Sequence, residues 1–91
     1  MEYLLRYVSM DTYHQILKDN NDYILGLLKD NYVDVNLNIK YLIKYGVTNI
    51  DKVIPNIIND LLLNNKDFEK KIEEYDKQLT KEEVIMLIEN M

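Results

Sequence analysis

The longest periodic pattern in this sequence is a run of apolar residues after Thr48 that recur at steps of three and four. Its members are Ile50, Val53, Ile54, Ile57, Ile58, Leu61 and Leu62. This spacing predicts a helix with one continuous apolar face. Thr48 and Asp51 stand at the spacing of an N-cap and an acidic third helical position, so we expect the helix to start near residue 49. Pro55 lies inside the run and removes one backbone hydrogen bond, which predicts a kinked helix or two short helices in line.

Two further helices are predicted towards the C-terminus. The first carries its apolar residues at steps of four, three and four, namely Phe68, Ile72, Tyr75 and Leu79. Thr80 and Glu83 then have the spacing of a capping box, in which each side chain satisfies a backbone N–H at the start of a helix. Apolar residues on one face follow this box, so we expect a helix over residues 80–91.

The N-terminal third has shorter patterns. Residues 2–18 are expected to form one helix, or two helices divided at Ser9. The stretch from Tyr23 to Leu28 is apolar nearly all round, which predicts a short buried helix in spite of Gly26.

Between Tyr32 and Ile39 the apolar and polar residues alternate strictly, which is typical of a half-buried strand. No second alternating run is present to pair with such a strand. We therefore interpret this stretch as an extended connection, with a lone strand as the alternative. Asn36 or Asn38 would then cap the next helix, and Gly46 would end it in a left-handed conformation.

Together these elements predict an all-α fold of five to seven short helices, arranged as a compact bundle or as a minimal two-unit helical repeat. Sliding the sequence by 38 residues aligns residues 3–7 with 41–45 and residues 21–25 with 59–63. The repeat interpretation gives units over residues 3–40 and 41–78 and a C-terminal capping helix over 80–91. In the bundle interpretation, the helices share residues only because the composition is biased.

The stretch from Leu42 to Ile54, continued by residues 61–63 and 79–85, resembles the helical repeat of the mitochondrial transcription termination factor type. The resemblance covers residues 42–88 and implies an all-α solenoid that grips nucleic acid in basic grooves. Asn59 and Asp60 stand where that repeat usually carries a proline, and this chain is acidic. Residues 39–46 also resemble the second helix of an ankyrin repeat, without its Thr-Pro-Leu-His turn. We take from both resemblances the helical repeat class and not the function.

The composition mainly excludes kinds of site and kinds of partner. Its 91 residues suffice for one domain over residues 1–91, and the absence of cysteine excludes disulfides and thiolate metal sites. The N-terminus lacks the features of a signal peptide and no stretch has the length of a membrane span, so we expect an intracellular, cytoplasmic protein without membrane contact. The formal net charge of −5, with a single arginine, makes nucleic acid an unfavourable partner.

Few residues could support catalysis. His14 is the only histidine, Ser9 is the only serine, and the two glycines are isolated. These counts exclude a histidine pair for zinc, a histidine-based triad around a nucleophile elbow, and a glycine-rich phosphate loop. We predict that the protein is not an enzyme and uses no cofactor and no metal ion.

The function that we predict is binding of a protein partner. Four acidic residues of the two C-terminal helices could form a negative surface for a basic partner: Glu73, Glu74, Glu82 and Glu83. Tyr7, Tyr41 and Tyr45 are expected at the edge of an interface, whereas Tyr23 and Tyr75 are expected in the core. One subclass fits the small size, the acidity and a composition typical of an AT-rich genome: an inhibitor or regulator from a phage or other mobile element, bound to a basic surface of a host protein.

Two alternatives remain open. A nucleic-acid-binding helical repeat would need its lysines on one concave face, namely Lys40, Lys44, Lys52, Lys66, Lys70 and Lys71. A structural or oligomerisation module would self-associate through an exposed apolar stripe.

Overall fold

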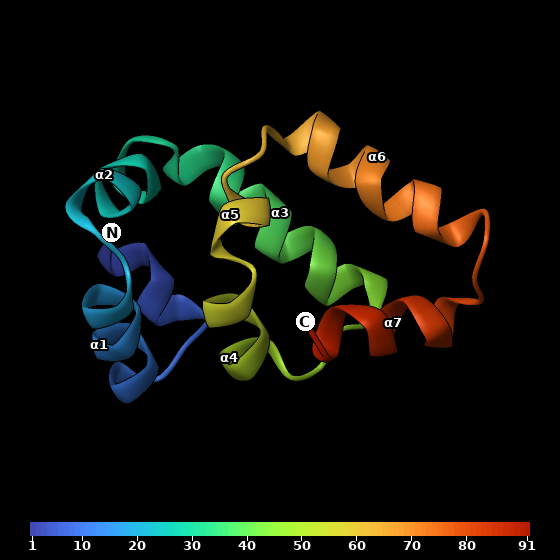
Figure 1. Ribbon diagram of the computed structural model, residues 1–91, viewed down its shortest axis with the longest axis horizontal. Helices are drawn as coiled ribbons and strands as arrows, with labels where there is room; N and C mark the ends of the chain where they lie inside the picture. Colours follow the sequence, from blue (N-terminus) through green and yellow to red (C-terminus); the bar gives the residue numbers. More distant parts are fainter.

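The chain folds into helices only, as its apolar periodicity predicts (Figure 1). The computed structural model describes residues 1–91, which form seven α-helices and two 3₁₀ turns. In chain order these are η1 (Glu2–Arg6), α1 (Met10–Asp19), α2 (Asp22–Asp30), α3 (Tyr32–Tyr45), α4 (Ile50–Val53), η2 (Ile54–Asn56), α5 (Ile58–Leu61), α6 (Asn65–Asp76) and α7 (Lys81–Glu89).

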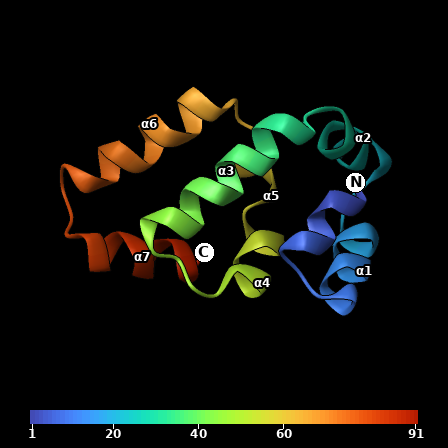
Figure 2. The same cartoon turned by 180° about the vertical axis from the view of Figure 1, so that it is seen from behind.

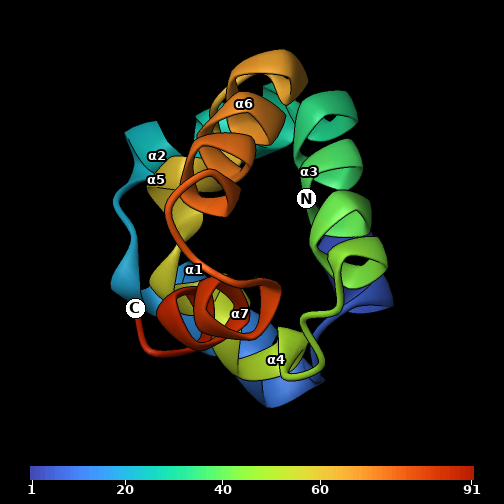
Figure 3. The same ribbon diagram turned by 90° about the vertical axis from the view of Figure 1, so that its right-hand side faces the viewer.

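Helix α3 is the central element, in contact with α2, α5 and α6 (Figures 1 and 2). The segments η1, α1 and α2 gather at its N-terminal end. Helix α6 runs beside α3 from its first half onward, and the chain then returns through α7, which lies beside α4 (Figure 3). None of the helices has both the length and the apolar character that crossing a membrane requires.

The core is aliphatic with one aromatic ring, that of Phe68. Every α-helix contributes to it. Its members are Leu4, Val8, Ile16, Leu28, Val35, Ile39, Leu42, Val47, Val53, Ile54, Ile57, Ile58, Leu61, Phe68, Ile72, Val84 and Ile88. Because each fully buried side chain of this kind stabilises the fold by roughly 1.5–3 kcal/mol, short helices that could not persist alone are held in place.

The prediction of an interruption at Pro55 is confirmed. Instead of one long helix after Thr48, the chain forms α4, the 3₁₀ turn η2 that contains Pro55, and then α5. Proline lacks the N–H that an uninterrupted α-helix would use at this position. The apolar side chains still face the core on both sides of the break, with Val53 and Ile58 buried.

The predicted cap of this segment is wrong. Helix α4 begins at Ile50 after Asn49, without a side-chain capping bond. The Asp51 carboxylate instead accepts hydrogen bonds from the Ser9 N–H (2.7 Å) and the Thr12 hydroxyl (3.1 Å) at the start of α1. These bonds hold the pKa of Asp51 below its usual value. A long-range contact therefore uses the carboxylate that a local cap would have used.

Residues 32–39 are neither a strand nor an extended connection, so both sequence interpretations are wrong. They form the first half of α3, which makes Asn36 and Asn38 interior helical residues and not caps. A helix satisfies its backbone groups internally, so it needs no partner strand. The alternating apolar residues divide between two sides of the helix: Val35 and Ile39 are buried, whereas Val33 and Leu37 are exposed.

The predicted end of this helix is confirmed. Gly46 has a φ of +123°, and its N–H and that of Val47 both donate to the Leu42 carbonyl. Glycine is needed here for a second reason, because a Cβ on Gly46 would lie 3.1 Å from the Ile85 Cδ1 of α7. The close packing of α7 on this turn therefore depends on the missing side chain.

The remaining local predictions mostly hold. Ser9 separates η1 from α1 and caps α1, and the capping box of Thr80 and Glu83 starts α7. Helix α2 covers the stretch from Tyr23 to Leu28, but only Leu28 is fully buried there. Tyr23 is 73% exposed, so its predicted place in the core is wrong. The proposed boundary between repeat units, after residue 40, falls within α3, and the repeat itself stays a prediction.

Candidate functional site

A shallow groove runs between α3 and α6, which lie side by side in the view of Figure 2. It has a volume of about 390 Å³. Its lining residues are Leu37, Lys40, Tyr41, Lys44 and Tyr45 from α3, and Asn65 and Glu69 from α6. Apolar, aromatic and charged side chains therefore meet at one surface.

The α3 wall contains a row of four apolar and aromatic residues at steps of four, Val33, Leu37, Tyr41 and Tyr45. A step of four turns by about 40° on an α-helix, so the row winds slowly from the outer surface towards α6. Val33 is 55% and Leu37 45% exposed, whereas both tyrosines are half-buried. The row thus begins in solvent and ends against α6.

Tyr41 and Tyr45 form the floor of the groove. The Tyr41 ring meets Phe68 edge-on, with ring centroids 6.3 Å apart, and lies 6.4 Å from the Tyr45 ring. The Tyr45 hydroxyl donates to the Asp76 carboxylate at the end of α6. The Lys81 Nζ of α7 lies 5.5 Å from the centre of the Tyr45 ring, within the range of a cation–π contact. Three helices therefore fix this tyrosine.

The electrostatic surroundings keep these phenols neutral. Burial raises the pKa of Tyr41, and the carboxylates of Glu73, Glu69 and Asp76 raise it further. Burial also raises the pKa of Tyr45, as does its hydrogen bond to Asp76. A phenol with a raised pKa is a poor base or nucleophile at neutral pH, so the floor can offer ring surface and hydrogen bonds to a bound partner.

A buried asparagine sets the position of α6 against α3. Asn38 is 0% exposed, and its side-chain amide donates to the carbonyls of Leu61 (3.0 Å) and Leu63 (2.8 Å). Its Oδ1 accepts from the Asn65 side chain (3.1 Å), while the Asn65 N–H donates to Asp34 (3.1 Å). Both amide hydrogens and the oxygen of Asn38 are thus satisfied. The local sequence does not indicate this role, because Asn38 stands where a helix cap is predicted and its partners lie 23 to 27 positions away.

The structure separates Tyr7 from the other two tyrosines predicted at an interface. Its hydroxyl donates to Asn36 Oδ1 (2.8 Å). Asn36 and Tyr45 are nine positions apart on α3, which at about 100° per residue is half a turn. Tyr7 therefore lies about half a turn of α3 away from Tyr45, and it does not line the groove.

The four glutamates predicted to form a negative surface are divided between two helices. Glu73 and Glu74 lie on the outer surface of α6, among three lysines. These are Lys66, Lys70 and Lys77. Glu82 and Glu83 occupy the first turn of α7, where the Glu83 carboxylate accepts the Thr80 N–H (3.0 Å). Of the four, Glu73 and Glu82 lie near the groove floor, since Glu73 raises the pKa of Tyr41 and Glu82 raises that of Tyr45.

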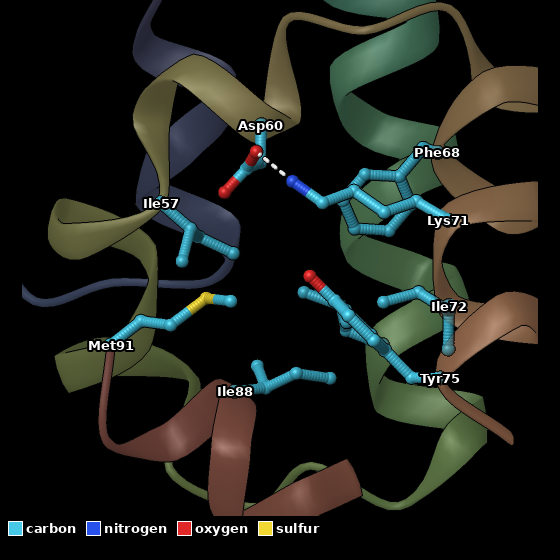
Figure 4. A pocket seen from close by; sticks show the side chains of 9 residues that line it. Ile57, Asp60, Phe68, Lys71, Ile72, Tyr75, Ile88 and Met91 are labelled. Carbon is cyan, nitrogen blue, oxygen red and sulfur yellow. Dashed lines mark hydrogen bonds and ion pairs between the residues drawn. The ribbon is translucent and has the colours of Figure 1, made fainter. Parts of the chain in front are cut away.

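A second candidate is a small apolar cavity between α3, α5, α6 and α7 (Figure 4). Its volume is about 20 Å³, room for one water molecule. Tyr75 and Met91 point into it, and an ion pair between Lys71 and Asp60 (2.6 Å) lies at its edge and raises the pKa of Lys71. Tyr75, predicted in the core, is half-buried here. The cavity is too small for an organic ligand.

The lysines that nucleic-acid binding would require are dispersed. Lys40 and Lys44 line the groove, Lys66 and Lys70 alternate with glutamates on the outside of α6, and Lys71 is paired with Asp60. No group of three or more histidine, aspartate and glutamate side chains is placed to hold a metal ion.

No protein-family model, curated protein or solved structure matches this chain. The resemblance of residues 42–88 to the termination-factor repeat therefore stays a resemblance.

Proposed function

We propose that this protein is a small, non-catalytic module that binds a protein partner through the groove between α3 and α6. The observation that carries the proposal is the row Val33, Leu37, Tyr41 and Tyr45, which continues from exposed aliphatic side chains to half-buried rings. Protein interfaces combine such apolar and tyrosine surface at their centre with charged residues at their rim. Here Lys40, Lys44 and Glu69 provide the rim.

Folding alone does not account for this row. The inner side of α3 already supplies Val35, Ile39 and Leu42 to the core, all of them fully buried. Single exposed apolar residues are normal on a protein surface. Val33 and Leu37 are instead neighbours on one helix face, and Leu37 lines the groove. Apolar surface of this kind marks interaction sites.

The finer hypothesis, an inhibitor from a phage or other mobile element that binds a basic surface, rests on the net charge of −5. Within it, Glu73 would contribute at the edge of the groove, and Glu74, Glu82 and Glu83 would extend the contact. Replacing all four by lysine is not a clean test, because Glu83 also caps α7.

The test is capture of a partner by the tagged protein from a lysate of its native host, with and without nuclease. The double variant Val33→Gln, Leu37→Gln removes the exposed apolar surface while keeping good helix formers in place. Met86→Gln is the matched control, since Met86 is 62% exposed on α7, outside the groove lining. We expect a protein that resists nuclease and is retained by the wild type and Met86→Gln, but lost from the double variant. Equal capture of a protein by all three would refute the groove as its binding site. A captured partner that nuclease releases would favour the nucleic-acid alternative.

A further inference from the structure

The two edges of the α3–α6 groove carry opposite charges at the same spacing. Lys40 and Lys44 lie four residues apart on α3 and line the groove, as does Glu69 on α6. Glu73 lies four residues after Glu69, beside it on the outer surface of α6. Four residues correspond to about 6 Å along a helix. The two lysines and the two glutamates therefore form pairs with matching separations.

The two helices also run in the same direction and in register (Figures 1 and 2). Asn65, at the start of α6, bonds to Asp34 and Asn38, and Phe68 one turn later meets Tyr41. These contacts place the turn with Glu69 beside the turn with Lys40, and the turn with Glu73 beside that with Lys44.

We propose that the groove binds a second copy of this chain, in a symmetric dimer whose two-fold axis runs along the groove; this inference rests on the proposed protein-binding function. Rotation about such an axis exchanges the α3 edge with the α6 edge. Each residue keeps its position along the direction of the groove. Helix α3 of each copy then faces α6 of the other, so Lys40 meets Glu69 and Lys44 meets Glu73, twice in the dimer. Leu37 and the tyrosine floors occupy the centre between these pairs.

The charges also disfavour the other simple two-fold arrangement. An axis across the groove would place α3 on α3 and α6 on α6, so lysines would face lysines and glutamates would face glutamates. Opposite charges steer association and like charges disfavour wrong pairings, so the groove edges specify one orientation. A helix from another protein would need acidic residues on one flank and basic residues on the other, a combination that this surface itself has.

Charge exchange between two variants tests the proposal. The variants K40E/K44E and E69K/E73K each place like charges across both edges of a homodimer. An equimolar mixture restores opposite charges, because the altered α3 of one chain then faces the altered α6 of the other. The quadruple variant restores them within one protein. A fifth protein, K70E/E74K, exchanges a lysine and a glutamate on the outer surface of α6 and serves as the matched control.

Mass in solution would be followed over a range of protein concentrations by sedimentation equilibrium, and helicity by circular dichroism. We expect the wild type and the control to reach twice the monomer mass. Each double variant should dimerise on the order of 100-fold more weakly, since four exposed ion pairs become repulsive. The mixture and the quadruple variant should regain dimerisation at unchanged helicity.

Three results would overturn the dimer: a wild type that stays monomeric, double variants that dimerise like the wild type, or a mixture that fails to associate. The capture experiment with Val33→Gln, Leu37→Gln tests separately whether the groove is a binding surface. A monomeric wild type whose captured partner is lost on Val33→Gln, Leu37→Gln would assign the groove to a different protein. A monomeric wild type whose capture is unaffected by that change would refute both proposals.

Discussion

The two sides of α3 use the same residue types for different purposes. The inner side buries Val35, Ile39 and Leu42 completely, together with Asn38, whose polar atoms are all hydrogen-bonded. The outer side leaves Val33 and Leu37 in solvent. The inner side therefore determines stability, whereas the outer side is free to serve binding, and substitutions on the two sides should separate these properties.

The largest contrast is expected between two leucines of this helix. Leu42→Ala removes a fully buried side chain and leaves a cavity, so it should lower the free energy of unfolding by about 2–5 kcal/mol. Leu37→Ala should change it by less than about 0.5 kcal/mol, because the side chain is 45% exposed. Urea unfolding followed by circular dichroism measures both. Similar losses for the two variants would contradict the division of α3 into a stabilising and a binding side.

A second contrast concerns two asparagines of α3. Asn38→Leu leaves the buried Leu61 carbonyl and the partly buried Leu63 carbonyl without their side-chain donor, so we expect a loss of about 2–4 kcal/mol. Asn36→Ala removes a partly exposed hydrogen bond with Tyr7 and should lower stability by about 1 kcal/mol or less. Equal effects in urea unfolding would show that Asn38 is not the residue that fixes α6.

Alanine substitution should change stability in opposite directions at the two glycines, Gly46 after α3 and Gly26 in α2. Gly46→Ala forces a side chain into a positive-φ conformation and against Ile85, which should lower stability by about 1–3 kcal/mol. Gly26 lies within α2, and a Cβ added there would meet no atom within 4 Å. Gly26→Ala should therefore raise stability by about 0.5–1 kcal/mol through helix propensity. Melting temperatures that move in the same direction for both variants would refute this account of Gly46.

The last contrast is a dependence of stability on pH that should appear only in alkali. Burial raises the pKa of Tyr3, whose hydroxyl donates to the Leu28 carbonyl, to about 12, and the pKa values of Tyr41, Tyr45 and Lys71 are also raised. A raised folded-state pKa stabilises the fold below the unfolded pKa, so this contribution is lost as the pH rises from the usual tyrosine value of 10 towards 12. Tyr3→Phe should lose less of its stability over that interval. A wild type whose unfolding midpoint is constant between these pH values would contradict the assignment.

Local signals explain most of what could be predicted about the fold. The division at Ser9, the cap at Thr80, the stop at Gly46 and the break at Pro55 all lie where the sequence indicates, because each depends on residues a few positions apart. The first half of α3 was mispredicted, since an alternating pattern on a helix with apolar residues on both sides looks like a strand. Once this stretch is known to be helical, the same pattern indicates an exposed apolar row that begins with Val33 and Leu37.

The candidate site was predictable only in part. Tyr41 and Tyr45, predicted at an interface, meet in the groove, but Tyr7 bonds to Asn36 outside the groove lining, and Glu82 and Glu83 lie on α7. Nothing in the local sequence indicates that α6 would pack beside α3 in register. Lys40 and Glu69 therefore could not be recognised as opposite edges of one surface.

The sequence by itself determined that the chain is helical, that α3 ends at Gly46, that the next segment breaks at Pro55, that α7 starts at the Thr80 box, and which apolar faces the later helices bury. Caps, turns and amphipathic periodicity act over a few residues, so they can be read without the fold. Only the tertiary structure decided that Asp51 binds the start of α1, that Asn38 holds the α5–α6 connection, and that α3 and α6 share a groove. These contacts join residues 23 to 42 positions apart, and no local propensity encodes which distant groups will meet when the core closes.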